Sequence, residues 1–153
     1  MAVTTDIGEA KDIHPKNKQE VGRRLAAIAL NDVYNIPQTC NGPVYKSVSF
    51  SNGKAFLSFT SIGKGLQARN KYGDLIGFEL AGADKKFYFA RAFIQDNQIV
   101  VSADSVVNPV AVRYGWSNAP VDINLYNIDG FPASPFRTDD WPGVTDSAGF
   151  FKN

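Results

Sequence analysis

The chain of 153 residues has one cysteine, one histidine and one methionine, and it has no long run of charged or of hydrophobic residues. The single cysteine, Cys40, excludes an internal disulfide, and with a lone histidine it leaves no Cys/His cluster for a structural zinc site. Basic and acidic residues number 16 and 15 and nearly cancel. Without a polybasic run, nucleic acid is a poor candidate partner. The longest apolar stretches are far shorter than a membrane span, and no signal-peptide pattern opens the chain.

The first 36 residues predict a short strand, a loop and one helix. The run from Ala2 to Asp6 is of β type, and Pro15 suits the first turn of a helix, where its missing N–H is not needed. Apolar residues then recur at the three- and four-residue spacing of one helix face: Val21, Leu25, Ile28 and Ala29. Ile36-Pro37 ends the helix, because the residue before a proline is pushed out of helical geometry.

One strand and one helix cannot bury both of their faces. We therefore expect residues 1–36 to be the last part of an α/β domain whose other elements lie outside this chain, which would be a fragment of a larger protein. Without that partner, the exposed helix of residues 16–33 would fray or support self-association.

From Val44 the sequence changes to the two-residue alternation of β-strands. Residues 44–50 and 55–60 alternate around Asn52-Gly53, a pair favoured in hairpin turns that need two positive φ angles. Further strands are predicted at 76–80, 87–93, 98–103, 111–114 and 122–126, with hairpin turns at Ala83-Asp84 and Asp96-Asn97.

The remaining segments are predicted to be irregular. Residues 61–72 are typical of a loop, and residues 131–153 of an ordered but irregular wrap. Short strands joined by tight turns favour a mainly β fold, with an accessory antiparallel β-sandwich or jelly-roll-like domain over residues 43–153.

His14 is the candidate general base. It lies on the predicted loop between strand and helix, and an exposed imidazole can take a proton when an acceptor holds its Nδ1 side. Asp12, two residues upstream, is the first candidate acceptor, followed by Asp6 and Glu9. In an extended loop, residues two apart project to the same side, so Asp12 can contact the ring. Alternatively, Asp12 caps the helix by accepting from free N–H groups of its first turn.

Motifs at both ends of the chain resemble one known family. Those of the first part are Ala2-Val-Thr-Thr-Asp-Ile-Gly8, Asp12-Ile-His-Pro-Lys-Asn-Lys18 and Gly22-Arg-Arg-Leu25. Those of the second part are Ala111-Val-Arg-Tyr-Gly-Trp-Ser-Asn118, Asn124-Leu-Tyr-Asn127 and Gly130-Phe-Pro-Ala-Ser-Pro-Phe-Arg-Thr-Asp139. Together they resemble the C-terminal part of the SGNH-type sialate O-acetylesterases, carbohydrate esterases that remove acetyl groups from sugars.

The resemblance implies a Ser-His-Asp triad with His14 as base and Asp12 as the residue that orients it. In the general superfamily pattern the aspartate stands three residues before the histidine, where this chain has Lys11. The family's nucleophilic serine and oxyanion-hole donors belong to earlier blocks that are not in this chain, and neither Ser117 nor Ser134 is in a nucleophile-type turn. We therefore expect the chain alone to be inactive.

The resemblance also implies what the intact enzyme would need. It would act on an O-acetylated sugar, sialate 9-O-acetyl groups above all, without a metal or any other cofactor, and its location would be periplasmic or secreted.

Three residues of the β domain are candidate sugar ligands. Trp116 could stack on a pyranose ring while Arg113 or Asn118 bonds to hydroxyls or a carboxylate; alternatively, these side chains pack the domain against its catalytic neighbour. The competing function for the chain is a non-catalytic β-sandwich module, glycan-binding or structural, to which residues 1–34 are merely attached.

Overall fold

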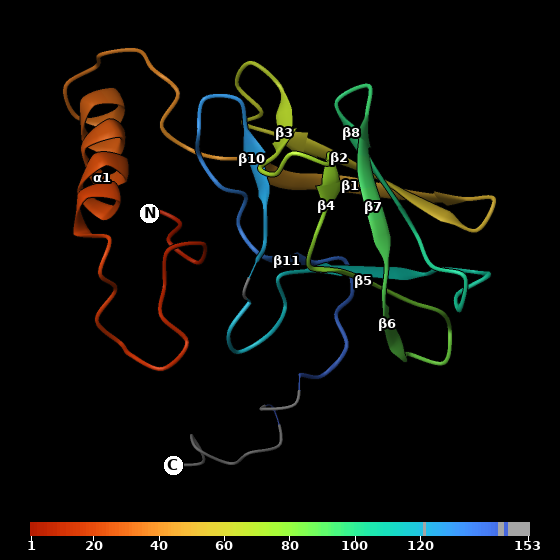
Figure 1. Cartoon of the computed structure of the whole chain (residues 1–153). Coiled ribbons are helices and arrows are strands. Elements are labelled where there is room, and N and C mark those ends of the chain that lie inside the picture. The colour runs from red at the N-terminus through yellow and green to blue at the C-terminus, as the bar shows by residue number, and fades with distance from the viewer. Residues whose placement is uncertain (121, 144–145, 147–153) are drawn as a thin grey trace.

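The computed structural model describes residues 1–120, 122–143 and 146. This part of the chain is mainly β, with one helix beside an antiparallel β domain (Figure 1). The elements in chain order are α1 (Lys18–Asp32), β1 (Val44–Ser51), β2 (Lys54–Thr60), β3 (Leu66–Ala68), β4 (Asp74–Leu75), β5 (Phe78–Ala81), β6 (Phe87–Phe89), β7 (Arg91–Gln95), β8 (Gln98–Ser102), β9 (Ala111–Tyr114), β10 (Leu125–Asn127) and β11 (Phe136–Arg137).

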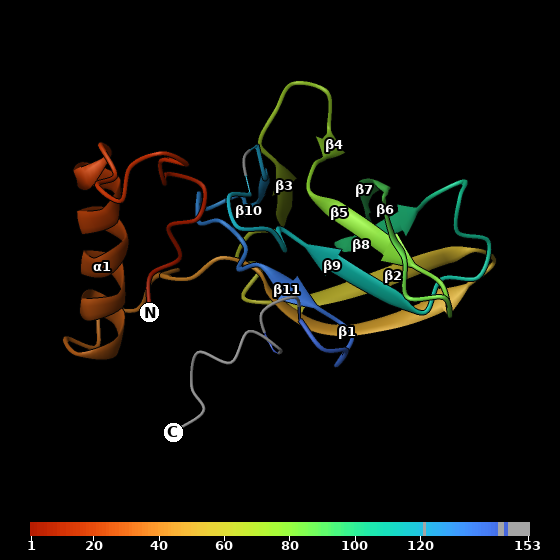
Figure 2. The same ribbon diagram turned by 90° about the horizontal axis from the view of Figure 1, so that it is seen from below.

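The strands form three antiparallel sheets. One sheet has the order β1-β2-β8-β7-β4, a second has the order β11-β9-β5-β6, and a third pairs β10 with β3. Only Ala90 separates β6 from β7, so one stretch of chain passes from the second sheet to the first. The two larger sheets enclose the main core, which confirms the predicted antiparallel sandwich (Figure 2).

Tight turns with positive φ angles join the longest hairpins, as the sequence predicts. Asn52 and Gly53 have φ angles of 49° and 71° between β1 and β2, and Asp96 and Asn97 have 50° and 57° between β7 and β8. Two consecutive positive φ angles are the geometry of the type I′ turn, whose twist matches that of the flanking strands. The predicted turn at Ala83-Asp84 joins β5 to β6.

Phe136 of β11 ties the C-terminal segment into the core. Its ring stacks on Tyr45 at a centroid distance of 4.9 Å, and it lies 5.6 Å from Phe59 and 5.7 Å from Tyr114. These partners belong to both large sheets, so the aromatic cluster joins the sheets. The predicted wrap is thus ordered up to residue 143; residues 144–145 and 147–153 lie outside the described residues.

Several local predictions are wrong. Residues 2–6 form no strand among the described residues, because no neighbouring strand pairs with them; the carbonyl of Val3 instead accepts a hydrogen bond from Arg24 at 2.7 Å. The predicted loop 61–72 contains β3. The strands predicted at 76–80 and 122–126 begin two and three residues later, at Phe78 and Leu125.

Helix α1 is present where the stripe predicts it, but a different residue caps it. The side chain of Asn17 accepts from the N–H of Glu20 at 3.1 Å, so Pro15 lies outside the helix and Asp12 is not its cap. The buried residues of α1 are Arg24 and Ala27, whereas Leu25 of the apolar stripe is 53% exposed. The β domain therefore covers the face next to the stripe. Self-association through residues 16–33 stays a prediction.

Candidate functional site

Asp12 and His14 contact each other on an exposed loop before α1. The imidazole Nδ1 lies 2.9 Å from Oδ1 of Asp12, and the same oxygen accepts the backbone N–H of His14 at 2.9 Å. The side chain of His14 is 78% exposed and that of Asp12 is 52% exposed. When Nδ1 carries the proton, it donates to Asp12 and leaves Nε2 free to accept a proton from a substrate or a nucleophile.

The loop holds Asp12 in the geometry that this contact needs. Glu9 and Asp12 form an isolated antiparallel bridge, and the ammonium of Lys16 lies 3.7 Å from the Glu9 carboxylate. The hydrogen bonds from the backbone and ring of His14 lower the pKa of Asp12, so the carboxylate is ionised at neutral pH. An ionised carboxylate at Nδ1 is the arrangement that orients a general base.

The nucleophile that such a base would serve is not in contact with it. Among the described residues, no serine hydroxyl is hydrogen-bonded to His14. Ser117 is exposed and Ser134 is half-buried. In the described part of the chain, the imidazole of His14 is therefore in contact with the Asp12 carboxylate and is not hydrogen-bonded to a serine hydroxyl.

A buried ionic cluster, which the sequence did not suggest, closes the base of the histidine loop. Both nitrogens of the Arg24 fork donate to Asp6, at 2.6 and 2.7 Å, and Nε of Arg24 donates to Glu20 at 2.9 Å. The hydroxyl of Tyr126 donates to Asp6 at 2.6 Å. The side chains of Arg24 and Asp6 are only 2% and 3% exposed. We call Asp6, Glu20, Arg24 and Tyr126 the Asp6 cluster.

The charges of the Asp6 cluster shift its pKa values. Burial pulls the pKa of Asp6 upward, but hydrogen bonds from Arg24 and Tyr126, with the positive charge of Arg24, outweigh it and lower that pKa below its usual value. Hydrogen bonds from Arg23 and then Arg24 lower the pKa of Glu20 to about 2. Burial and the bond to Asp6 raise the pKa of Tyr126. The carboxylates are therefore bound as anions.

Acid should weaken the ion pairs of the Asp6 cluster. A carboxylate whose folded pKa is depressed stabilises the fold above its unfolded pKa, and that stability is lost as pH falls through the folded value. For Glu20 the window runs from 4.5 down to about 2. We expect the midpoint of urea unfolding to fall across this window and Glu20→Gln to flatten part of the fall. The pKa of Asp139 is also lowered, so Asp139 adds to the fall of the midpoint, and Glu20→Gln leaves that contribution in place. If the urea midpoint falls with pH as steeply in Glu20→Gln as in the unchanged chain, the lowered pKa assigned to Glu20 is contradicted.

The three candidate sugar ligands are placed differently from one another. The guanidinium of Arg113 is engaged by Asp139 through bonds of 2.9 and 2.7 Å and lies 4.0 Å from the Phe87 ring centroid. Trp116 is 44% exposed, with the Arg137 guanidinium 5.2 Å from its ring centroid, and Asn118 is exposed. Because Arg113 is bound within the fold, the geometry favours its structural interpretation.

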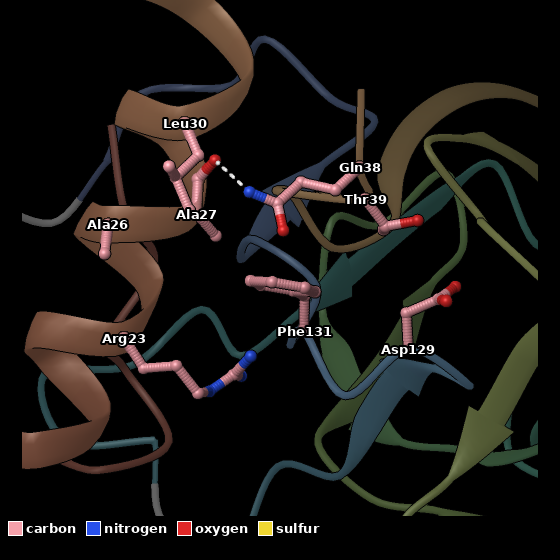
Figure 3. A pocket seen from close by; sticks show the side chains of 8 residues that line it. All are labelled: Arg23, Ala26, Ala27, Leu30, Gln38, Thr39, Asp129 and Phe131. Atoms are coloured by element: carbon pink, nitrogen blue, oxygen red, sulfur yellow. Dashed lines mark hydrogen bonds between the residues drawn. The ribbon is translucent and has the colours of Figure 1, made fainter. Parts of the chain in front are cut away.

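A groove of about 410 Å³ lies between α1 and the β domain (Figure 3). The Gln38 side chain donates across it to the carbonyl of Ala27 at 3.3 Å, and the Arg23 guanidinium lies 4.7 Å from the Phe131 ring centroid. Arg23 also donates to the carbonyl of Gly130 at 3.2 Å. These contacts tie the helix to the β domain.

The described part of the chain offers neither a candidate metal site nor a candidate membrane span. It holds no group of three or more His, Cys, Asp or Glu side chains arranged to bind a metal ion. No helix in it is both long enough and apolar enough to cross a membrane.

Similarity to known proteins points to the carbohydrate acetylesterases. The solved structure of a novel carbohydrate acetylesterase from Xanthomonas citri matches this chain with a TM-score of 0.87 and 49% sequence identity. The match covers 92% of this chain and 32% of the acetylesterase chain, so the present chain spans about a third of that protein's length. No protein-family model and no curated protein matches the chain. The match supports the expected resemblance of this chain to a carbohydrate esterase.

Proposed function

We propose that this chain is the C-terminal part of a carbohydrate acetylesterase with a Ser-His-Asp triad. The observation that carries the proposal is the Asp12–His14 contact of 2.9 Å on an exposed loop. The sequence identity of 49% between this chain and part of a carbohydrate acetylesterase supports a catalytic interpretation of that contact. In this proposal His14 is the general base, Asp12 orients it, and the serine comes from a part of the enzyme outside this chain.

The proposed reaction is acyl transfer to serine followed by hydrolysis. The serine oxygen attacks the acetyl carbonyl while Nε2 of His14 takes its proton, and the imidazolium then gives that proton to the departing sugar oxygen. In the second step the same imidazole takes a proton from a water molecule, whose oxygen attacks the acetyl-serine; the imidazolium then returns the proton to the departing serine oxygen, and acetate is released. Asp12, ionised and bonded to Nδ1, stabilises the imidazolium in both steps.

The finer proposal is that the enzyme is an SGNH-type sialate 9-O-acetylesterase. Its support is the resemblance of the motifs around Asp12–His14 and of residues 111–139 to that family. Every O-acetylated sugar carries the same acetate ester, and the triad chemistry is the same for each. A direct comparison of sugars therefore identifies the substrate.

Acetate release tests both levels of the proposal. The longer protein that contains this chain should release acetate from acetylated carbohydrates, with higher kcat/KM on 9-O-acetyl sialic acid than on acetylated xylan. The 153-residue chain alone should not hydrolyse p-nitrophenyl acetate above the buffer rate, because its described residues bring no serine to His14. Sustained hydrolysis by this chain that His14→Ala abolishes would contradict the assignment of the nucleophile to another part. Absence of acetate release from every sugar by the longer protein would overturn the proposal.

A further inference from the structure

The loop that carries Asp12 and His14 is pinned at both of its ends by the Asp6 cluster. Asp6 precedes the loop, and Arg24 follows it in the second turn of α1. Their bidentate ion pair, with bonds of 2.6 and 2.7 Å, therefore closes residues 7–17 at the base. The carbonyl of Val3, three residues before Asp6, accepts a further bond from Arg24 at 2.7 Å. A loop with fixed ends has far fewer conformations than one with a free end.

The β domain supplies one direct bond to this closure. Tyr126 lies on β10, where its backbone pairs with Gln67 of β3, and its hydroxyl donates to Asp6 at 2.6 Å. The Arg69 guanidinium lies 4.6 Å from the Tyr126 ring centroid, and Tyr126 as a whole is 5% exposed. Because Tyr126 is fixed by the sheet and by burial, its hydroxyl offers Asp6 a defined position.

The bonds to Asp6 are strong and directional in this setting. Asp6 and Arg24 are almost completely removed from water, so solvent screens their charges little. A planar guanidinium that binds two carboxylate oxygens fixes the orientation of both groups. A shift of Asp6 would therefore move the start of the histidine loop relative to α1.

We propose that Tyr126 is a positioning residue, through which the β domain sets the place of Asp12 and His14 by way of Asp6 and Arg24. This inference rests on the proposed function for its catalytic meaning, although the pinning of the loop can be measured without any activity. It gives the β domain a role in the reaction other than binding sugar. In this proposal the hydroxyl of Tyr126 acts through its bond to Asp6 and not through a bond to the substrate.

Trypsin cleavage of this chain measures the pinning. Lys11 and Lys16 lie within the loop, whereas Lys54 lies in the β1–β2 hairpin. Tyr126→Phe removes the hydroxyl and keeps the buried ring. We expect cleavage after Lys11 and Lys16 to accelerate by about tenfold, and cleavage after Lys54 to keep its rate. Tyr72→Phe is the matched control, because Tyr72 is 74% exposed and no hydrogen bond of its hydroxyl is found among the described residues.

Two outcomes of the cleavage experiment would overturn the inference. Unchanged cleavage after Lys11 and Lys16 would mean that the hydroxyl does not hold the loop. An equal acceleration after Lys54 would mean that Tyr126 contributes only to the stability of the whole fold.

Kinetics of the longer protein test whether Tyr126 contributes to the reaction by positioning His14. Tyr126→Phe should lower kcat on an acetylated sugar by about tenfold while KM changes by less than about twofold, because a misplaced base slows the chemistry and leaves substrate binding intact. In a His14→Ala background the same change should have no further effect on the residual rate. Full activity of His14→Ala would refute the proposed function. An inactive His14→Ala with an unaffected Tyr126→Phe would refute only the positioning role.

Discussion

Replacing His14 by alanine should lower the kcat of the proposed acetylesterase by roughly four to six powers of ten. Without the imidazole no group takes the proton of the serine, and the departing sugar oxygen has no proton donor. The thermal midpoint should hardly change, because the side chain is 78% exposed and contributes little packing. The measurement is acetate release from an acetylated sugar at saturating substrate, with thermal unfolding of the same preparation.

Asp12→Asn provides the graded comparison. An amide at this position keeps the size of the side chain but loses the charge that stabilises the imidazolium and selects the Nδ1–H tautomer. We expect a smaller loss of kcat than for His14→Ala. Lys11→Ala, the change of an exposed neighbour, should leave kcat unaffected. Retained activity in His14→Ala would remove the basis of the esterase assignment, and an unaffected Asp12→Asn would transfer the orienting role to another carboxylate.

Arg24→Ala should lower the free energy of unfolding by about 3–5 kcal/mol, the usual cost of breaking one side of a buried ion pair. The reason is that Asp6, 3% exposed, would keep its charge or take up a proton in a site that water scarcely reaches. Chemical denaturation at neutral pH measures the loss. Lys64→Ala is the control, because its pair with Asp129 spans 3.7 Å and its side chain is 78% exposed. We expect that control to cost about 0–1 kcal/mol.

A double substitution distinguishes the lost ion pair from lost packing. Arg24→Met with Asp6→Leu removes both charges and keeps most of the buried volume, so it should be more stable than Arg24→Ala. If the double variant is as unstable as Arg24→Ala, the cost lies in packing, in the bond that Tyr126 donates to Asp6 or in the bond that Val3 accepts from Arg24. A loss in Arg24→Ala no larger than that of Lys64→Ala would refute the importance of the buried pair.

The local features of this fold could be predicted because each rests on a short stretch of sequence. The alternation on both sides of Asn52-Gly53 predicts the β1–β2 hairpin, and the spacing of Val21, Leu25 and Ile28 predicts the helix. Three strands of two or three residues, β3, β4 and β11, could not be predicted, because so few residues show no period. They exist because partners distant in the sequence, β10 in the case of β3, provide their hydrogen bonds.

In the candidate site, too, contacts between near neighbours in the sequence could be predicted, and contacts between distant residues could not. The Asp12–His14 contact joins residues two apart, and an extended loop is enough to predict it. The Asp6 cluster joins residues 18 and 120 apart, and in the sequence Arg24 looks like a solvent-facing helix residue. Its burial depends on the arrival of Asp6 and Tyr126 from elsewhere, which no local pattern records. The sequence does carry one sign of the cluster, since Asp6 and Arg24 both lie within the motifs that show the family resemblance.

The separation of 120 residues between Asp6 and Tyr126 bears on the order of events during synthesis. A ribosome makes the histidine segment first and Tyr126 last among the members of the cluster, and contacts so distant in sequence form late because a long loop must close first. While the chain is being made, Asp6 has no Tyr126 to bind. The histidine segment would therefore acquire its final shape only after β10 has been translated and has paired with β3. A chain that stops before Tyr126 would carry His14 in a segment that is still mobile.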